Sequence, residues 1–517
     1  MSKSTKIKPF FSLVIIAALF LGSCYRPGPA SEPFQVSWQE EGATQTAAAG
    51  DEEISFPMDS TEETPEFIEM RYATPTPNPP IVLPTPRTET VTYVVQSGDT
   101  LRRIAQLHQV SIAQIVAENE IENPDLISVG QVLSIPPTTF EGTAPAFKII
   151  PDSELVNSPG NADFDVAGFV LRFEGYLASY EEEVEGVLLN GPEIVERVAL
   201  LYSVNPRLLL AVLEFQSQWV TEPEPPEETL EFPMGYYDSR RAGLYKQLGW
   251  AANLLNEGFY LWQRQLIHGW TLSDSTMIAV DPTINPGTAG VLNLMRYLAT
   301  SAEWDWAVNE AGFFATYYRF FGYPFDFAFE PLIPAGLEQP ELQLPFEVGD
   351  VWSYTGGPHG GWDSGSAWAA LDFAPPGEPR GCVPSDTWVV ASAPGEIVYS
   401  DHGAVIQDLQ GDGVWQTGWS IFYMHIDTHN RVEVGAFLEA GDRVGHPSCE
   451  GGFSTGTHLH IARRYNGVWI AADGDLPFIM DGWVSSGYGR EYNGYLTKGE
   501  MVLEAWNGRT PTNAIQR

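Results

Sequence analysis

Hydrophobic and polar residues are patterned differently in successive parts of this chain of 517 residues. Between residues 91 and 137, two strand-like segments flank two segments whose apolar residues, such as Leu101, Ile104 and Ala105, recur at helical spacing. Residues 150–345 continue that helical spacing in longer segments. Later stretches such as residues 420–426 and THLHIA are typical of strands. The patterns predict a multidomain α+β chain: a small β-α-α-β module, a mainly α middle domain, and a C-terminal domain rich in antiparallel strands.

The middle segment, residues 150–345, has the clearest helical pattern. Val195, Val198, Ala199 and Tyr202 stand at positions i, i+3, i+4 and i+7, and Asn205-Pro206 is typical of a helix start. Further helices are expected over residues 244–259, 290–302 and 304–321. The C-terminal domain is expected to begin at residue 346 and to run to residue 517.

The first 90 residues predict export and a tether. Lysines precede an apolar run over residues 10–21, which is too short to span ~30 Å of hydrocarbon as a helix and fits a signal peptide. The closing letters of residues 1–23, with Cys24, resemble a bacterial lipobox, which implies cleavage before Cys24 and a lipid on its thiol. We therefore expect an extracytoplasmic protein anchored by lipid to the membrane of a bacterial cell envelope. The acidic, proline-rich residues 24–90 predict a disordered tether.

Charge and cysteine content narrow the classes of function. The chain has 67 acidic and 27 basic residues, a formal net charge of −40, which argues against nucleic acid as a partner because phosphate binding needs a basic patch. With Cys24 lipidated, Cys382 and Cys449 are an even pair and predict a disulfide in an exported chain. Zinc-binding thiolates are the alternative, although neither cysteine belongs to a Cys-x-x-Cys pair. The oligomeric state is not specified by the sequence.

Residues 91–137, with the segments YVVQSGDTLRRIAQLHQVS and NPDLISVGQVLSIP, resemble a LysM module along their whole length. The resemblance implies binding to glycans that contain N-acetylglucosamine, chiefly peptidoglycan or chitin. It places the binding groove at Gly98, Asp99, Thr100, Leu101, Pro124, Asp125 and Leu126. We interpret His108, on a helix face, as structural.

The middle domain resembles, weakly, the lysozyme-like fold of lytic transglycosylases. In that family a helix pattern ends in a catalytic acid, and the matching position here is Gln216, whose amide cannot protonate a glycosidic oxygen. Glu214 is two positions away, about 200° round the helix, so it is expected to face the other way. We therefore expect a helical, lysozyme-like domain without catalytic activity, with an unrelated helical bundle as the alternative.

Seven of the nine histidines follow residue 350. His359, Asp372 and His460 can supply two imidazole nitrogens and one carboxylate oxygen, a set that zinc takes while leaving a position for water. Because residues i and i+2 of a strand share a face, His458 can lie beside His460, and His425 can add another imidazole. A neutral histidine next to zinc-bound water can take its proton.

The segments GGPH…LDF, STGTHLH and APGEIVYS make residues 345–490 resemble the lysostaphin and beta-lytic zinc metallopeptidases, which cut cell-wall peptides. The resemblance implies Zn²⁺ held by His359, Asp372 and His460, with His425 and His458 as the catalytic pair. The interval of 13 from His359 to Asp372 resembles the beta-lytic branch, and Asp363 is the rival ligand if the chain follows the shorter His-x-x-x-Asp form. Asp372 is favoured because it stands in the motif-like ALDF context, and residues 360–368 are then an insertion. The candidates for stabilising an oxyanion are Tyr354 and Tyr488.

These features favour a peptidoglycan-binding zinc metalloendopeptidase that hydrolyses stem peptides or cross-bridges. One alternative is a non-catalytic wall-binding scaffold or an activator of another hydrolase. A second alternative is a lytic transglycosylase acting through the helical domain, against which Gln216 argues.

Overall fold

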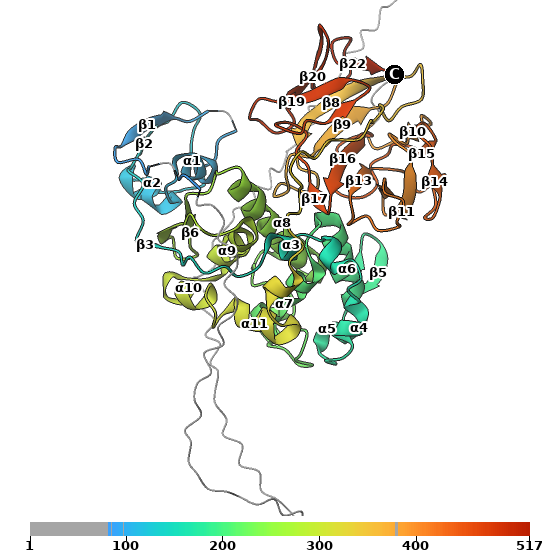
Figure 1. The fold of residues 1–517 in the computed structure, drawn as a ribbon. Coiled ribbons are helices and arrows are strands. Elements are labelled where there is room, and N and C mark those ends of the chain that lie inside the picture. The colour runs from blue at the N-terminus through green and yellow to red at the C-terminus, as the bar shows by residue number, and fades with distance from the viewer. Residues whose placement is uncertain (1–80, 84, 97, 378–380) are drawn as a thin grey trace, which may run out of the picture. The chain divides into compact units, whose positions relative to one another are not determined.

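The computed structural model describes residues 81–83, 85–96, 98–377 and 381–517 (Figure 1). The expected signal peptide, Cys24 and most of the expected tether lie outside these residues, so they remain predictions. Among the described residues, none of the helices combines the length and the apolar character that crossing a bilayer requires.

The N-terminal module has the predicted β-α-α-β order: β1 (Val91–Val94), α1 (Leu101–His108), α2 (Ile112–Glu118) and β2 (Val132–Ile135). The two strands pair antiparallel. Helix α2 begins with a capping box, in which Ser111 accepts from the Gln114 backbone and Gln114 accepts from the Ser111 backbone. The apolar faces of both helices enclose a small core with the strands.

The middle region is mainly helical, as the spacing predicted. Its helices are α3 (Asp152–Leu155), α4 (Val166–Val170), α5 (Tyr176–Ser179), α6 (Gly191–Tyr202), α7 (Pro206–Ser217), α8 (Leu244–Gln263), α9 (Pro286–Leu298), α10 (Ser301–Ala307) and α11 (Phe313–Phe321). Short 3₁₀ turns occur at η1 (Pro159–Asn161), η2 (Glu227–Thr229), η3 (Ser239–Arg241) and η4 (Pro324–Phe327). Its strands are β3 (Gly142–Thr143), β4 (Glu181–Val184), β5 (Val187–Asn190), β6 (Gly269–Thr271) and β7 (Met277–Ala279).

Two helix predictions in this region need correction. The expected helix over residues 290–302 begins earlier, at Pro286, and ends at Leu298. The expected helix over residues 304–321 is two helices, α10 and α11. At the break, a side chain on Gly312 would collide with the carbonyl oxygens of Trp306 and Ala307, so the tight turn requires glycine.

The C-terminal region is built of antiparallel strands, as predicted. Its main sheet has the order β14-β11-β12-β13-β16-β9-β8-β22, with β17 paired to β16 (Figure 1). The strands of this sheet are β8 (Val351–His359), β9 (Ala370–Ala374), β11 (Gly395–Asp401), β12 (Ala404–Asp408), β13 (Trp419–Met424), β14 (Phe437–Leu438), β16 (Leu459–Tyr465), β17 (Val468–Trp469) and β22 (Ala514–Gln516). Beside it, β10 (Val389–Val390) pairs with β15 (Arg443–Gly445), and a meander joins β18 (Ile479–Met480), β19 (Trp483–Gly487), β20 (Gly494–Lys498) and β21 (Met501–Glu504).

The main sheet is covered on both faces. On one face, Leu371 and Leu459 belong to a core formed within the C-terminal region. On the other face, Phe422 and Ala462 belong to a cluster that continues into the helical region, for example to Leu255. The sheet and the helices therefore share a continuous hydrophobic core, and the face that meets the helices is also the face that carries the candidate site.

Candidate metal centre and peptidase site

The three side chains expected to bind zinc converge on one face of the main sheet. Asp372 of β9 lies opposite His460 of β16 in the strand register, and His359 ends the neighbouring strand β8. The Nε2 atom of His359 and the Nδ1 atom of His460 are 3.0 Å apart. The Oδ1 atom of Asp372 lies 3.2 Å from the first of these nitrogens and 3.3 Å from the second.

These atoms suit a metal ion. Oδ1 of Asp372 is buried and has no hydrogen-bond partner among the described residues. The side chain of His359 is 3% exposed, and those of Asp372 and His460 are each 12% exposed. Although burial opposes it, the adjacent His359 and His458 lower the pKa of Asp372 well below its usual value, so the carboxylate stays charged. Two imidazole nitrogens and one buried carboxylate oxygen form a donor set that zinc takes.

Backbone carbonyls determine which nitrogen each candidate ligand presents. Nδ1–H of His359 donates to the Gly357 carbonyl at 2.8 Å, and Nε2–H of His460 donates to the Gly361 carbonyl at 3.0 Å. Each ring therefore turns its other nitrogen, which carries a lone pair, toward Asp372. Such bonds to the outer nitrogen orient histidine ligands in metal sites. The motifs did not predict these two carbonyl contacts.

His425 and His458 form the second pair that the sequence predicted. Their ring centroids are 4.4 Å apart, and Nε2 of His458 lies 3.6 Å from Oδ1 of Asp372. Nδ1–H of His425 donates to the Glu450 carbonyl at 3.0 Å, and Nδ1–H of His458 donates to the Gly456 carbonyl at 2.8 Å. Burial, followed by the neighbouring histidines, lowers the pKa of His425 to about 3. This ring is therefore neutral near pH 7 and can accept a proton at Nε2.

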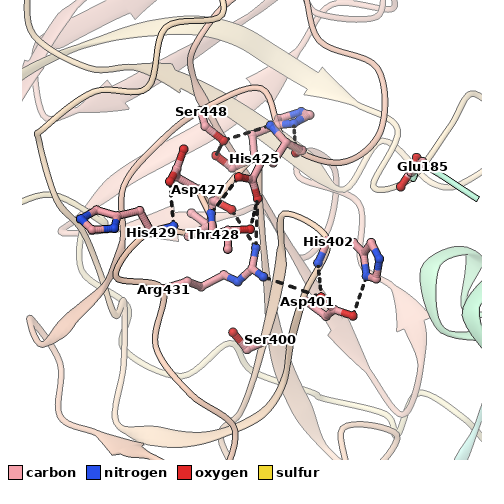
Figure 2. Close-up of polar contacts among 12 residues, drawn as sticks. Glu185, Ser400, Asp401, His402, His425, Asp427, Thr428, His429, Arg431 and Ser448 are labelled. Carbon is pink, nitrogen blue, oxygen red and sulfur yellow. Dashed lines mark hydrogen bonds and ion pairs between the residues drawn. The ribbon is translucent and has the colours of Figure 1, made fainter. Parts of the chain in front are cut away.

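A polar network holds the segment that carries His425 (Figure 2). His425 has a left-handed φ of 66°, and its carbonyl accepts from both the backbone N–H and the hydroxyl of Ser448. Arg431, whose side chain is 9% exposed, lies 3.3 Å from the Glu450 carboxylate and 3.8 Å from the Asp401 carboxylate. The guanidinium thus links two loops beside His425 and His458. No sequence motif indicated this role for Arg431.

Asp363, the rival ligand, lies outside the cluster of donor atoms. Its Oδ2 accepts from the hydroxyl of Tyr202, at the end of α6, at 3.2 Å. Two residues on, the N–H of Gly365 donates to Oδ1 of Asn253 in α8 at 2.7 Å. The segment expected to be a simple insertion is therefore attached to the helical region. It also contains Gly361, whose carbonyl orients His460.

The cluster opens into a cavity of about 1060 Å³. Its walls include Tyr202 of the helical region and the segment over residues 452–457. Near this segment, Cys449 forms the predicted disulfide with Cys382, with a Cα–Cα distance of 5.3 Å. The N–H of Thr457 also donates to the Gly381 carbonyl at 2.9 Å.

Neither tyrosine predicted to stabilise an oxyanion is among the described residues that line this cavity. Tyr354 is fully buried in the C-terminal core, because along β8 it points to the face opposite the site. Tyr488 is 48% exposed and packs against Tyr495. A third tyrosine, Tyr492, lines the cavity and stacks on the ring of His359 with a centroid distance of 4.3 Å. The only sequence signal for Tyr492 is its position in the aromatic segment after β19.

The residues expected to form the glycan groove have mixed surroundings. Asp99 accepts from Tyr93 and Gln96, and Thr100 accepts from the Arg103 N–H at the start of α1. Leu101 is 4% exposed, within the module's core. Leu126 is 72% exposed and available to a ligand. Of the other expected groove residues, Gly98 has a φ of +87°, while Pro124 and Asp125 are exposed.

In the helical region, Glu214 is held in an ion pair. Its side chain is 1% exposed and lies 2.7 Å from the Arg319 guanidinium, and it also accepts from the Thr221 hydroxyl at 2.7 Å. Gln216 is directed elsewhere, toward Gly235. The lysozyme-like resemblance of this region remains a prediction, and the arrangement offers no free carboxylic acid at either position.

Comparisons with known proteins agree with this order of domains along the chain. The LysM domain model matches residues 93–136, the model of the LasA N-terminal domain matches residues 148–334, and the model of peptidase family M23 matches residues 382–472. Protease LasA of Pseudomonas aeruginosa is 26% identical over 314 residues, which are 55% of this chain and 70% of that protein.

Beta-lytic metalloendopeptidase of Lysobacter enzymogenes is 30% identical over 169 residues, which are 30% of this chain and 88% of that protein. A solved structure described as the M23 metalloprotease pseudoalterin is 22% identical, covers 35% of this chain and 99% of its own, and has a TM-score of 0.28. The fold and the relatives define a peptidoglycan-related metallopeptidase that carries a LysM domain. The chain belongs to peptidase family M23.

Proposed function

We propose that this protein is a zinc-dependent endopeptidase that hydrolyses peptide bonds in the stem peptides or cross-bridges of peptidoglycan. His359, Asp372 and His460 hold the zinc ion. The observation that carries the proposal is the buried Oδ1 of Asp372, which has no hydrogen bond from any residue that the structure describes and faces two imidazole nitrogens. When bound, zinc supplies a Lewis acid that polarises the scissile carbonyl and acidifies a water molecule.

The remaining side chains of the site handle protons and substrate. His425 and His458 both line the cavity, and backbone carbonyls occupy both Nδ1–H groups, so Nε2 is the nitrogen that each ring can present to a substrate. One ring takes the proton of the attacking water, and a protonated ring returns it to the leaving amine. Tyr492 borders the same space, and its hydroxyl is the candidate donor to the developing oxyanion.

The order of domains along the chain suits an enzyme that acts on a polymeric substrate. We propose a lipoprotein signal over residues 1–23, a tether over 24–90, a LysM domain over 91–137, a non-catalytic helical domain over 150–345 and the peptidase over 346–517. The LysM domain holds glycan through the loops at Gly98 and Pro124, while lipid on Cys24 keeps the enzyme at the envelope, outside the cytoplasm. Because the LysM domain and the peptidase act on the same polymer, holding the glycan raises the local concentration of the peptides to be cut.

The test is digestion of purified cell wall by the fragment 91–517. New free amines should appear, and either chelation or His460→Ala should abolish them. His429→Ala, at an exposed histidine outside the cavity, is the matched control and should retain full activity. Amine release that survives both chelation and His460→Ala would reject the zinc mechanism.

Two further measurements separate the alternatives. A wall-binding scaffold should contain no stoichiometric zinc and should release no amines, whereas the proposed enzyme should contain one zinc per chain. New reducing or anhydro sugar ends would instead indicate glycan cleavage by the helical domain.

A further inference from the structure

A second cavity adjoins the catalytic one. It has a volume of about 430 Å³ and lies in the helical region. Tyr202 lines both cavities, so its side chain is a wall that the two spaces share. The lining residues are Tyr202, Tyr236, Asp238, Arg240, Arg241, Tyr245, Lys246 and Gly249. We call this space the cationic pocket.

Positive charge dominates the cationic pocket, although the chain as a whole has a net charge of −40. Three of its lining residues are cations and one is an acid. The acid, Asp238, is already engaged, because the Arg240 guanidinium donates to both carboxylate oxygens, at 3.0 and 2.7 Å. Arg241 and Lys246 form no salt bridge with any carboxylate in the described part of the chain. Two cations are therefore available to a ligand.

Glu182, on the facing hairpin, is not among the residues that line the pocket. Glu182 of β4 accepts from the backbone N–H of Tyr245 and from the hydroxyl of Tyr180, both at 3.1 Å. Its carboxylate is thereby directed at the start of α8. Among the residues that line the pocket, cations therefore outnumber acids by three to one.

The aromatic walls of the pocket are held in place by packing. Tyr236 stacks on Trp250 with a centroid distance of 4.6 Å and an interplanar angle of 9°. Tyr245 lies under the Arg197 guanidinium at 5.9 Å. Fixed rings beside unpaired cations suit a ligand that combines an anionic group with an apolar or sugar body.

We propose that the cationic pocket is a substrate subsite that binds an anionic group of the cell wall while the adjoining cavity holds the scissile bond. The inference rests on the proposed peptidase function and extends it. The anion we assign is a free carboxylate of a stem peptide, since such a group belongs to the same molecule as the bond that is cut. Phosphate of other wall polymers offers a similar charge, and the test distinguishes it.

The experiment measures binding by the full chain after removal of metal. The probe is a sugar-free cross-linked stem peptide, to which the LysM domain contributes nothing. Arg241→Ala/Lys246→Ala should weaken its binding about tenfold. Amidating the free carboxylates of the peptide should weaken binding to the unaltered protein by a similar factor and should make the double variant and the unaltered protein equivalent. The matched control, Arg172→Ala/Lys498→Ala, removes two exposed cations elsewhere and should leave binding unchanged.

Each other outcome has a defined meaning. Equal binding by the double variant and the unaltered protein overturns the inference. Weakened binding of a phosphate-rich wall polymer, with peptide binding unchanged, overturns the assignment to a carboxylate. Because binding needs no catalysis, tight peptide binding without cleavage by the zinc-loaded protein would reject the proposed function and leave the subsite intact. Unchanged thermal unfolding of both double variants verifies that each is folded.

Discussion

Two buried carboxylates in this protein have opposite surroundings. In the helical region, Glu154 is fully buried and accepts from the Arg207 guanidinium at 3.1 and 2.7 Å, from Asn205 at 2.9 Å and from the hydroxyl of Tyr317. In the main sheet, Oδ1 of Asp372 has no such donor among the described residues.

The difference separates a structural acid from a ligand. Both carboxylate oxygens of Glu154 accept hydrogen bonds, and the Arg207 guanidinium supplies a full countercharge. The rings around Asp372 instead direct their N–H groups to backbone carbonyls and direct lone pairs inward. A cation is the partner that satisfies a carboxylate and two imidazole lone pairs at once.

Asp372→Asn should show the strongest functional effect. Loss of the charged ligand should remove bound zinc and lower peptide cleavage by about 10³-fold or more. The metal-free variant should also be less stable than the metal-free parent at pH 7, because the neighbouring histidines that lower the pKa of Asp372 stabilise its charged form in the folded state. Metal content, amine release and denaturant unfolding test the three parts. A variant that keeps zinc and activity would show that Asp372 is not a metal ligand and that its role is structural, like that of Glu154.

Arg207→Met should lower the stability of the protein and leave its zinc binding intact. Removing the countercharge of a buried carboxylate costs about 3–5 kcal/mol, so the free energy of unfolding should fall by that amount while folded molecules still bind zinc. Arg443→Met, which breaks an exposed pair with Glu347, is the control and should cost less than about 1 kcal/mol. A similar loss of unfolding free energy in both variants would contradict the distinction between an acid that the fold supplies with donors, such as Glu154, and one that it leaves without them, such as Asp372.

Asp152 is an intermediate case and predicts a pH effect. It accepts from Asn285 and Gly287 at 2.7 and 2.8 Å, yet burial, and then the nearby Glu330, raises its pKa to about 6. A raised acid pKa means that the folded state binds the proton more tightly, so this stability is present at low pH. It should be lost as the pH rises from about 4 to about 6. Asp152→Asn should therefore stabilise the protein at pH 7 by about 2 kcal/mol and flatten the dependence of Tm on pH. A Tm that rises with pH equally in both proteins would contradict the assignment.

Tyr202→Phe, a substitution in the helical region, should have a small effect on the metal centre of the C-terminal region. The variant loses only the hydrogen bond to Asp363, worth about 1 kcal/mol. Because that loop carries the Gly361 carbonyl that orients His460, zinc affinity should fall a few-fold. Tyr260→Phe, which loses a bond to the Trp469 backbone outside the loop, should lower stability and leave zinc affinity unchanged. Equal zinc affinity in all three proteins would show that the helical region does not influence the metal centre.

The sequence predicted helices and strands better than the contacts between residues that are distant along the chain. Helical spacing located α1, α2 and α8, and strand alternation placed His458 and His460 on one face, because both patterns repeat over a few residues. The break at Gly312 was missed because it depends on a close backbone approach. Asp372 was preferred to Asp363 through its motif context, and only the structure shows the contact that occupies Asp363. Arg431 had no motif, and Tyr492 had only its position in an aromatic segment, since the partners of both residues are distant along the chain.

The pairing of β8 with β9 has a consequence for how this peptidase can vary. Gly356 lies opposite Asp372, and His359 lies opposite Ala370, so the positions of both candidate metal ligands are determined by hydrogen bonds between strands. The number of residues in the connection between them is therefore free to change. A single insertion inside either strand would turn a ligand to the wrong face, whereas insertions in the connection leave the metal geometry intact. Relatives with short and long connections can thus share one chemistry, and the longer connection here has gained contacts with a second part of the chain.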